Sequence, residues 1–315
     1  METKNEETPL KIRSVKGTIT AGYRLYMGNF RRIFRATWPA ALLCGLVSAL
    51  YYHTMISTLP QLFSAQAQIA QGNVSGALTA YAVQSGLSLL NLVAALLFVS
   101  YAFSMLCRHR EEGIIPYPAR WLSRPDGRAL LRTVLSALVW MLVMIVVIGI
   151  PTAIVTIGAL SMSLTTMGLG ALLELLFIAL IALPLVYPHM RYLTTRNTRL
   201  FSILGSGYRQ GMRHWGYIFA VLLVLLLLTA IVLSITMLPA IVLLTANMKA
   251  QTGVIMGDPL GMPSYMGWLS LIVFILSGFI QAYVVLAIHF PAYYMAGSIE
   301  QQEIQRHETT ENTLH

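Results

Sequence analysis

The sequence predicts an all-α, polytopic integral membrane protein with six transmembrane helices. Three observations predict this class: the composition, the length of six apolar runs and the placement of the positive charges. The 315 residues are 57% hydrophobic and only 10% charged, whereas a soluble domain carries roughly 25% charged residues. The mean hydropathy of +0.68 likewise indicates that lipid surrounds most of the chain.

Six apolar runs reach the length of about 20 residues that a helix needs to cross the hydrocarbon core. The expected spans are Thr37–Ser57, Ser85–Cys107, Thr133–Ile157, Gly168–His189, Tyr217–Leu243 and Gly267–Phe290. Residues 1–36 are then an N-terminal segment, residues 37–291 the transmembrane domain and residues 292–315 a C-terminal tail. The first run begins too late to belong to a cleaved signal peptide.

Positive charges alternate between the gaps that separate these runs. Of the 21 Lys and Arg residues, eight precede the first run, six follow the second, five follow the fourth and Arg306 lies in the tail; only Lys249 falls in the other gaps. Cytoplasmic loops retain Lys and Arg. The pattern therefore predicts a bacterial cytoplasmic (inner) membrane protein with both termini in the cytoplasm.

Three connections are expected on the outer side: Thr58–Gln84, Gly158–Met167 and Leu244–Met266. The first of them contains no charged residue. Its apolar residues suggest a short helix on the outer surface, and a flexible loop is the alternative.

Two basic segments resemble each other. Gly22–Phe34 reads GYRLYMGNFRRIF and Gly207–Phe219 reads GYRQGMRHWGYIF, at a constant offset of 185 residues. Both directly precede a span. We interpret them as an internal repeat; the alternative is that any basic segment beside a span looks like this.

The first copy carries one apolar stripe at three- and four-residue spacing, typical of an amphipathic helix. The stripe consists of Ile19, Tyr23, Tyr26, Met27 and Phe30. Such a helix is expected in the plane of the interface with its apolar face toward lipid. Gly28–Asn29 is expected to end it.

A third basic segment, Ser123–Arg132, has capping-box spacing and precedes the third span. The sequence thus predicts basic amphipathic interfacial helices before spans 1, 3 and 5. Because the positive charges lie beside spans, anionic lipid headgroups are a simpler partner than nucleic acid. The expected lipid contacts are Lys16, Arg24, Arg31, Arg32, Arg35, Arg124, Arg128, Arg132, Arg209 and Arg213.

Glu174 is the one acidic residue inside an expected span. A carboxylate there is costly unless it is paired or faces a cavity, so a polar site formed with His53 and Asn91 is one hypothesis. The alternative is that Glu174 reaches the outer headgroups. Pro151, Pro184 and Pro239 interrupt three spans, which is compatible with a transporter site and also with ordinary membrane helices.

Signatures of catalysis are absent from the sequence: it has no HExxH, GxSxG, CxxC or phosphate-binding loop motif. The two Asp residues, Asp126 and Asp258, lie in separate expected loops, so paired carboxylates for hydrolysis are hard to assemble. Cys44 and Cys107 have no partner at metal-ligand spacing. We therefore expect no catalytic, cofactor or metal site.

The segment Gly22–Phe30, the six-span layout and the closing Pro291-Ala-Tyr-Tyr-Met-Ala-Gly segment carry a family resemblance. The chain resembles a broad family of uncharacterised bacterial six-span membrane proteins, including the membrane domain associated with glycerophosphodiester phosphodiesterases. The resemblance implies an all-helical membrane module and supplies no active-site residues. The chain carries no phosphodiesterase domain, so that activity is not implied.

The function expected from these features is that of a non-enzymatic membrane module that binds lipid or a partner protein and supports envelope homeostasis. The alternative is a small-molecule or ion transporter that uses a site near Glu174. An intramembrane enzyme is disfavoured because the catalytic sets are missing. The sequence identifies no protein partner.

Overall fold

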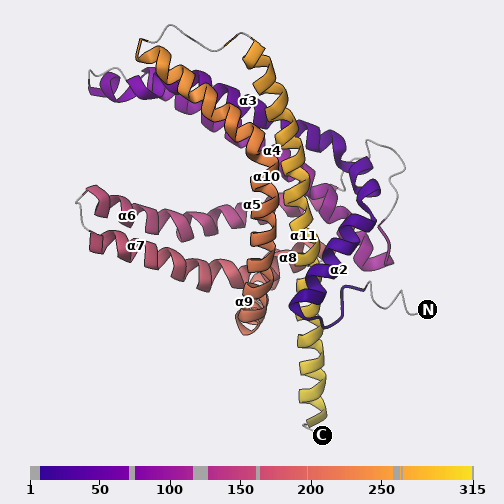
Figure 1. The fold of residues 1–315 in the computed structure, drawn as a ribbon. Helices are drawn as coiled ribbons and strands as arrows, with labels where there is room; N and C mark the ends of the chain where they lie inside the picture. The colour runs from indigo at the N-terminus through magenta and orange to yellow at the C-terminus, as the bar shows by residue number, and fades with distance from the viewer. Residues whose placement is uncertain are drawn as a thin grey trace. The chain divides into compact units, whose positions relative to one another are not determined.

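The computed structural model describes residues 8–70, 75–115, 127–160, 164–196, 198–257, 263 and 265–313. Within these residues the chain is helical and holds no strand (Figure 1). The helices are α2 (Val15–Gly28), α3 (Phe30–Ala70), α4 (Ser75–Glu112), α5 (Gly127–Met144), α6 (Ile150–Leu160), α7 (Leu164–Phe177), α8 (Leu183–Thr194), α9 (Leu200–Arg213), α10 (Trp215–Ile255) and α11 (Tyr265–Thr313). Two π-helical turns, Ile145–Gly149 and Ile178–Ala182, join α5 to α6 and α7 to α8.

Six helical stretches among these residues are long and apolar enough to cross a membrane. They are Phe30–Thr58, Ala82–Glu112, Gly127–Gly158, Leu164–Thr194, Trp215–Val254 and Tyr265–Asn312. Many large apolar side chains on them are exposed, for example Leu175 (68%), Leu226 (64%) and Ile235 (68%). Exposed apolar surface on this scale is unfavourable in water and favourable in lipid. The number of expected spans is confirmed.

The helices extend beyond the expected spans, and the expectation for the first outer connection is corrected. Helix α3 continues to Ala70 and α4 begins at Ser75, so most of the first outer connection is a continuation of two helices. Helix α11 runs on to Thr313, and its residues from Ala292 to Ile299 are buried. The expected tail is therefore the end of a packed helix.

The repeat extends over two pairs of helices. Helices α2 and α9 have 14 residues each, and α3 and α10 have 41 each, with all bounds offset by 185 residues. The breaks fall at Asn29 and His214, whose backbone N–H groups donate to the carbonyls of Leu25 and Gln210. The expected helix end at Gly28–Asn29 is confirmed, and the motif has a matching backbone in both copies.

The chain forms two compact units. The first contains Met1–Arg35, Ser100–Leu227 and Ala287–His315, and the second contains Ala36–Val99 and Leu228–Leu286.

In the first unit, the glycine of each motif copy packs against a proline of another helix. A Cβ atom at Gly22 would lie 2.3 Å from Cα of Pro291 in α11, and one at Gly207 would lie 2.6 Å from Cβ of Pro188 in α8. Glycine is thus required for the close approach of these helices. Tyr26, expected on the lipid-facing stripe, is instead buried and packs on Phe290 with ring centroids 5.0 Å apart.

Proline also explains one of the π-helical turns. Pro184 has no N–H group to donate to the carbonyl of Leu180, four residues earlier. The Tyr208 hydroxyl donates to that carbonyl at 2.7 Å, and Trp215 Nε1 donates to the neighbouring carbonyl of Ala179 at 2.8 Å. The polar groups freed by the proline are therefore satisfied by the second motif copy.

Helices α6 and α7 form a hairpin in the first unit and lie side by side (Figure 1). Gly158 and Gly170 allow their close approach, because Cβ atoms there would lie 2.8 Å from N of Met167 and 2.5 Å from Cγ2 of Val155. Small residues commonly have this role between membrane helices.

The second unit packs segments of α3, α4, α10 and α11. Gly45 and Gly278 bring α3 and α11 together, since a Cβ atom at Gly45 would lie 2.6 Å from the carbonyl oxygen of Ile275. Polar pairs link the other helices: Ser48 donates to Asn91 at 3.4 Å and Asn247 to Ser270 at 2.8 Å.

Candidate functional site

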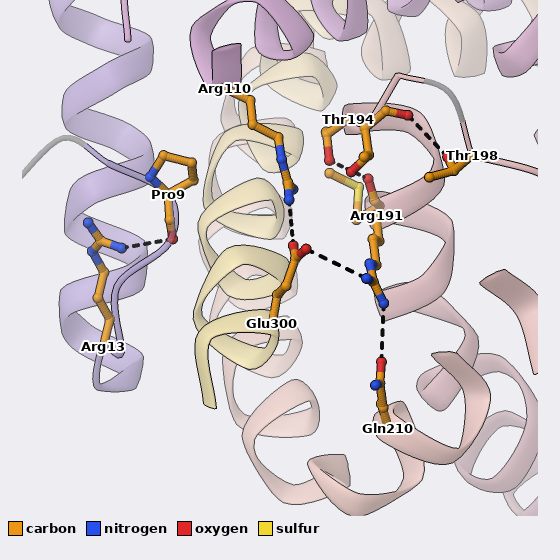
Figure 2. Close-up of polar contacts among 10 residues, drawn as sticks. Pro9, Arg13, Arg110, Arg191, Thr194, Thr198, Gln210 and Glu300 are labelled. Atoms are coloured by element: carbon orange, nitrogen blue, oxygen red, sulfur yellow. Dashed lines mark hydrogen bonds and ion pairs between the residues drawn. The ribbon is translucent and has the colours of Figure 1, made fainter. Parts of the chain in front are cut away.

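Half-buried charges of the first unit meet near the C-terminal end of α11. The Glu300 carboxylate lies 2.6 Å from Nη2 of Arg110 in α4 and 3.7 Å from Nη2 of Arg191 in α8. Figure 2 shows Glu300 between these two guanidinium groups, with Arg191 also directed toward Gln210 of α9. The Glu300 carboxylate thus connects α11 to α4 through Arg110 and to α8 through Arg191.

Glu303, one turn further along α11, closes a second ionic contact. Its two oxygens accept from Nη1 of Arg213 at 2.8 and 3.0 Å, and Oε1 lies 2.9 Å from Nε2 of His214. The Glu303 side chain is only 6% exposed. A buried carboxylate without partners is strongly unfavourable, so Glu303 fixes the junction of α9 and α10 against α11.

The segment before α2 reaches the same end of α11. The Arg13 N–H donates to Ser298 Oγ at 3.0 Å, and the Arg13 guanidinium lies 4.8 Å from the centroid of the Tyr294 ring. It also donates to the carbonyl of Thr8 and to that of Pro9 (Figure 2). Desolvation by burial lowers the pKa of Arg13, but a guanidinium still remains a cation at neutral pH.

A cavity of about 420 Å³ opens beside these contacts, between α2, the start of α3 and the end of α4. Among the described residues, the Lys and Arg side chains that line it are those of Arg24 and Arg32, both exposed, and no carboxylate lines it. Arg32 also donates to the carbonyl of Ile115 at 3.0 Å. The inner wall contains His109 and Tyr294, both fully buried.

His109 is positioned by the end of α4. Gly113 has a φ of +73°, and its N–H donates to the His109 carbonyl at 2.9 Å, a helix-ending geometry that favours glycine. Nδ1 of His109 lies 3.1 Å from the Tyr293 hydroxyl. Nε2 is buried and has no hydrogen-bond partner, which is rare for a native polar atom.

Two further hollows of the first unit are lined by cations and, in the part of the chain that the structure describes, by no acid. One of about 390 Å³ is lined by Lys11, Arg13, Lys16 and Arg24. The other, about 180 Å³, is lined by Arg128, Arg132 and Arg196. Arg132 also donates to the carbonyls of Thr195 and Thr198 and stacks on Tyr192 at 4.6 Å.

The expected lipid contacts thus have different surroundings. Arg24, Arg32 and Lys16 line hollows, while Arg31, Arg35 and Arg209 are exposed elsewhere on the first unit. Arg128 and Arg132 lie at the start of the spanning helix α5, and Arg213 pairs with Glu303. Arg124 and the capping-box residues Ser123–Asp126 lie outside the described residues.

The expected polar site of Glu174, His53 and Asn91 stays a prediction. Glu174 is half-buried in α7 of the first unit, and none of the described residues forms a hydrogen bond or ion pair with it. Asn91 accepts from Ser48 in the second unit. His53 is exposed and lines a cavity of about 260 Å³ there with Asn247 and Gln251.

Sequence reasoning missed Glu300, Glu303 and His109. The signal for the two acids was their spacing of three residues on a helix that follows an apolar segment, which places both on one face. Within the described part of the chain, no group of three or more His, Cys, Asp or Glu residues could hold a metal ion. Comparisons with protein-family models, curated proteins and solved structures give no match to this chain.

Proposed function

We propose that this chain is a multi-pass protein of a bacterial cytoplasmic membrane that binds anionic phospholipid headgroups and serves envelope homeostasis without catalysis. The observation that carries the proposal is the set of three hollows that are lined by Lys and Arg and, among the residues that the structure describes, by no carboxylate. All three belong to the first unit. Cations beside a membrane attract anionic headgroups, with about 1 kcal/mol for each Lys or Arg near the surface.

The proposed orientation places both termini in the cytoplasm, so that the basic hollows meet the cytoplasmic leaflet. The alternation of positive charge between the apolar runs supports this orientation. In addition, α2 carries exposed Lys16 and Arg24 together with Met27, which is 68% exposed. Exposed cations together with an exposed apolar side chain are typical of a helix in the membrane interface. The family of bacterial six-span proteins that the chain resembles would have the same arrangement.

Cysteine labelling of intact cells tests the orientation. A membrane-impermeant maleimide should react with Met256→Cys, on the proposed outer side, and leave Arg108→Cys unlabelled. Both native residues are exposed, and the native Cys44 and Cys107 are buried. The opposite labelling pattern would contradict the proposed orientation.

A transporter that uses Glu174 is the second candidate. The π-helical turns before Pro151 and Pro184 favour it, because such turns are frequent at functional sites. It ranks second because Tyr208 and Trp215 already satisfy the carbonyls near Pro184, so a structural role accounts for that turn.

Lipid retention tests the headgroup proposal. The full chain, bound to resin in neutral detergent, is equilibrated with equal amounts of phosphatidylglycerol and phosphatidylcholine, washed, and its lipid is quantified by mass spectrometry. Wild type should retain phosphatidylglycerol preferentially. A variant with Gln at Lys16, Arg24, Arg31, Arg32 and Arg35 should lose most of the preference, whereas Lys249→Gln should keep it.

The preference should also weaken as salt rises from about 0.1 to 1 M, because the Debye length falls from roughly 10 to 3 Å. Equal retention by wild type and the five-residue variant at every salt concentration would refute the electrostatic proposal.

A further inference from the structure

We infer that the cavity lined by His53, Asn247 and Gln251 binds the hydroxyl groups of a sugar ring. The inference goes beyond the proposed function, which concerns hollows of the first unit, because the residues described around this cavity all belong to the second unit. Its volume of about 260 Å³ lies just below the range of about 300–1,000 Å³ that is usual for drug-sized ligands. The ligand is therefore small.

Three helices each present one face to the cavity. The lining residues on each helix are three or four positions apart, which places them on the same side of that helix. The residues that carry the argument are His53 and Ile56 on α3, Asn247 and Gln251 on α10, and Ser270 and Phe274 on α11. A site built on packed helices holds its polar groups in fixed positions.

One wall of the cavity is apolar. Ile56 and Phe274 are 7% and 1% exposed, and both belong to a buried cluster with Ala49 and Ala240. An apolar wall with a few polar groups is usual for small-ligand sites. A sugar ring matches such a wall, because it carries C–H bonds on its faces and hydroxyl groups around its edge.

Asn247 offers the ligand an acceptor. Its side-chain nitrogen donates to the carbonyl of Leu243 at 2.7 Å and to Ser270 Oγ at 2.8 Å. Because a carbonyl can only accept, these bonds fix the orientation of the amide and use both of its N–H groups. No described residue donates to Asn247 Oδ1. The ligand group at this oxygen must therefore be a donor, which a phosphate or carboxylate oxygen is not.

Ser270 offers the ligand a donor. Its side chain is buried, 3% exposed, and its oxygen accepts from Asn247. No described residue accepts from its O–H group, and a buried donor without an acceptor is unfavourable. An ammonium group cannot accept this bond. A hydroxyl group donates and accepts at once, so hydroxyls satisfy both Asn247 and Ser270.

Gln251 and His53 extend the same chemistry. Neither side chain forms a hydrogen bond or ion pair with the described residues, although Gln251 is half-buried. The Gln251 amide can accept from one hydroxyl and donate to its neighbour. An imidazole ring contributes a further polar contact. Four polar side chains therefore converge on a volume of the size of one sugar ring.

The cavity lies at the level of lipid headgroups. His53 is near the end of the first spanning stretch and Ser270 near the start of the sixth. Tyr265 and Trp268, 65% and 73% exposed, lie at the same helix end as Ser270, and Tyr and Trp are enriched at membrane interfaces. Both a glycolipid headgroup and a free sugar can reach this level, and they share the hydroxyl chemistry.

Binding to the full chain in a polyoxyethylene detergent, which carries no sugar, tests the inference. Glucosyl dioctanoylglycerol and glucose are the separate probes, and dioctanoyl phosphatidylcholine is the control lipid without a hydroxyl in its headgroup. Wild type should bind the glucosyl lipid at least about tenfold more tightly than phosphatidylcholine. Tighter binding of the glucosyl lipid than of glucose would identify a lipid headgroup as the ligand, and equal binding would identify the free sugar.

Two variants locate the binding in the cavity. Gln251→Leu and His53→Phe should each raise the Kd for the glucosyl lipid about tenfold, because each removes hydrogen bonds to the ligand. Neither removes a bond to a described residue, so thermal unfolding should stay near that of wild type. Thr252→Val is the matched control. The Thr252 hydroxyl donates to the Met248 carbonyl of its own helix at 2.9 Å, and this variant should bind within about threefold of wild type.

Two results would overturn the inference. Wild type that binds the glucosyl lipid no more tightly than phosphatidylcholine would show that the cavity does not recognise a sugar. Unchanged affinity in both Gln251→Leu and His53→Phe would place the binding outside the cavity. Either failure leaves the proposed function standing, because retention of phosphatidylglycerol is measured with the five-residue variant of the basic segment.

Discussion

The two copies of the repeated motif share their backbone and differ in how their charges are used. Helices α2 and α9 have the same length, end at breaks 185 residues apart and place a glycine on a proline. In the second copy, Arg213 and His214 at the break are paired with Glu303. In the first copy, the described residues that line the cavity beside the break at Asn29 include no acid.

The difference follows from the residues at equivalent positions. Asn29 of the first copy corresponds to His214, and Arg32 corresponds to Tyr217. Tyr217 is 2.5 Å from Thr18 Oγ1, an internal contact between α10 and α2, whereas Arg32 extends to a cavity. The second copy therefore has a structural role at its helix break, and the first copy contributes Arg24 and Arg32 to the lining of a cavity. The comparison teaches that a shared motif sets the helix break, and that the residues at equivalent positions decide what surrounds its cations.

The largest effect on stability is expected at the glycine–proline contact that both motif copies share. Gly22→Ala places a Cβ atom 2.3 Å from backbone atoms of Pro291, and Gly207→Ala places one 2.6 Å from the Pro188 side chain. Overpacking of this kind costs about 1–3 kcal/mol. We expect about 3 kcal/mol of destabilisation for Gly22→Ala and about 1.5 kcal/mol for Gly207→Ala, because only the first clash is with backbone.

Unfolding of the full chain in neutral detergent measures both variants. Gly28→Ala is the matched control, since a Cβ atom at Gly28 meets nothing within 4 Å, and it should leave stability unchanged or raise it by up to about 1 kcal/mol. The glycine–proline contact would be shown unimportant if Gly22→Ala were as stable as this control.

The second-largest effect on stability is expected at Glu303, the acid of α11 that pairs with the second motif copy. Glu303→Gln leaves Arg213 and His214 without their carboxylate. Loss of one partner of a buried pair costs about 3–5 kcal/mol, and because Arg213 is 39% exposed we expect about 2 kcal/mol. Glu111→Gln is the control: its ion pair with Arg196 is more than 40% exposed on both sides and should contribute less than about 0.5 kcal/mol.

The same unfolding assay measures these two variants. Equal stability of Glu303→Gln and Glu111→Gln would mean that the charges at the second break are solvated, and the contrast between the two copies would then disappear.

Much of the architecture could be predicted because it is encoded locally. The six spans follow from hydropathy, and the helix end at Asn29 follows from the Gly28–Asn29 pair. The helix lengths were underestimated, since hydropathy detects only the part that lies in hydrocarbon. The 41 residues of α3 contain an expected span of 21.

The contacts that define the candidate site join residues far apart in sequence, which explains why they were missed. Gly22 meets Pro291, and Arg110 meets Glu300, 190 residues away. The motif spacing placed Arg24 and Arg32 on a basic surface, but their meeting with His109 depends on how α2 packs near the end of α4. In the sequence alone, Glu300 and Glu303 fall in a polar C-terminal segment. The structure shows that this segment continues helix α11.

The smallest effect on stability is expected at Glu174, which contrasts with Glu303. Both are glutamates in helices of the first unit, yet Glu303 is paired with Arg213 and His214, whereas Glu174 has no ion-pair partner among the described residues. If Glu174 reaches the outer headgroups, Glu174→Gln and Glu174→Leu should change stability by less than about 0.5 kcal/mol. Lipid retention should match wild type, and membrane insertion of Glu174→Leu should improve, because an apolar residue is cheaper in hydrocarbon than a carboxylate.

Expression in the membrane fraction, unfolding and growth of cells that depend on the protein measure these variants together. Loss of function in both variants at normal expression would show that the carboxylate itself is needed, and would move the transporter ahead of the lipid-binding proposal. Tolerance of Gln with loss of function in Leu would instead indicate a hydrogen bond that the neutral amide can keep. Only wild-type behaviour of both variants agrees with a glutamate that, unlike Glu303, takes no part in holding helices together.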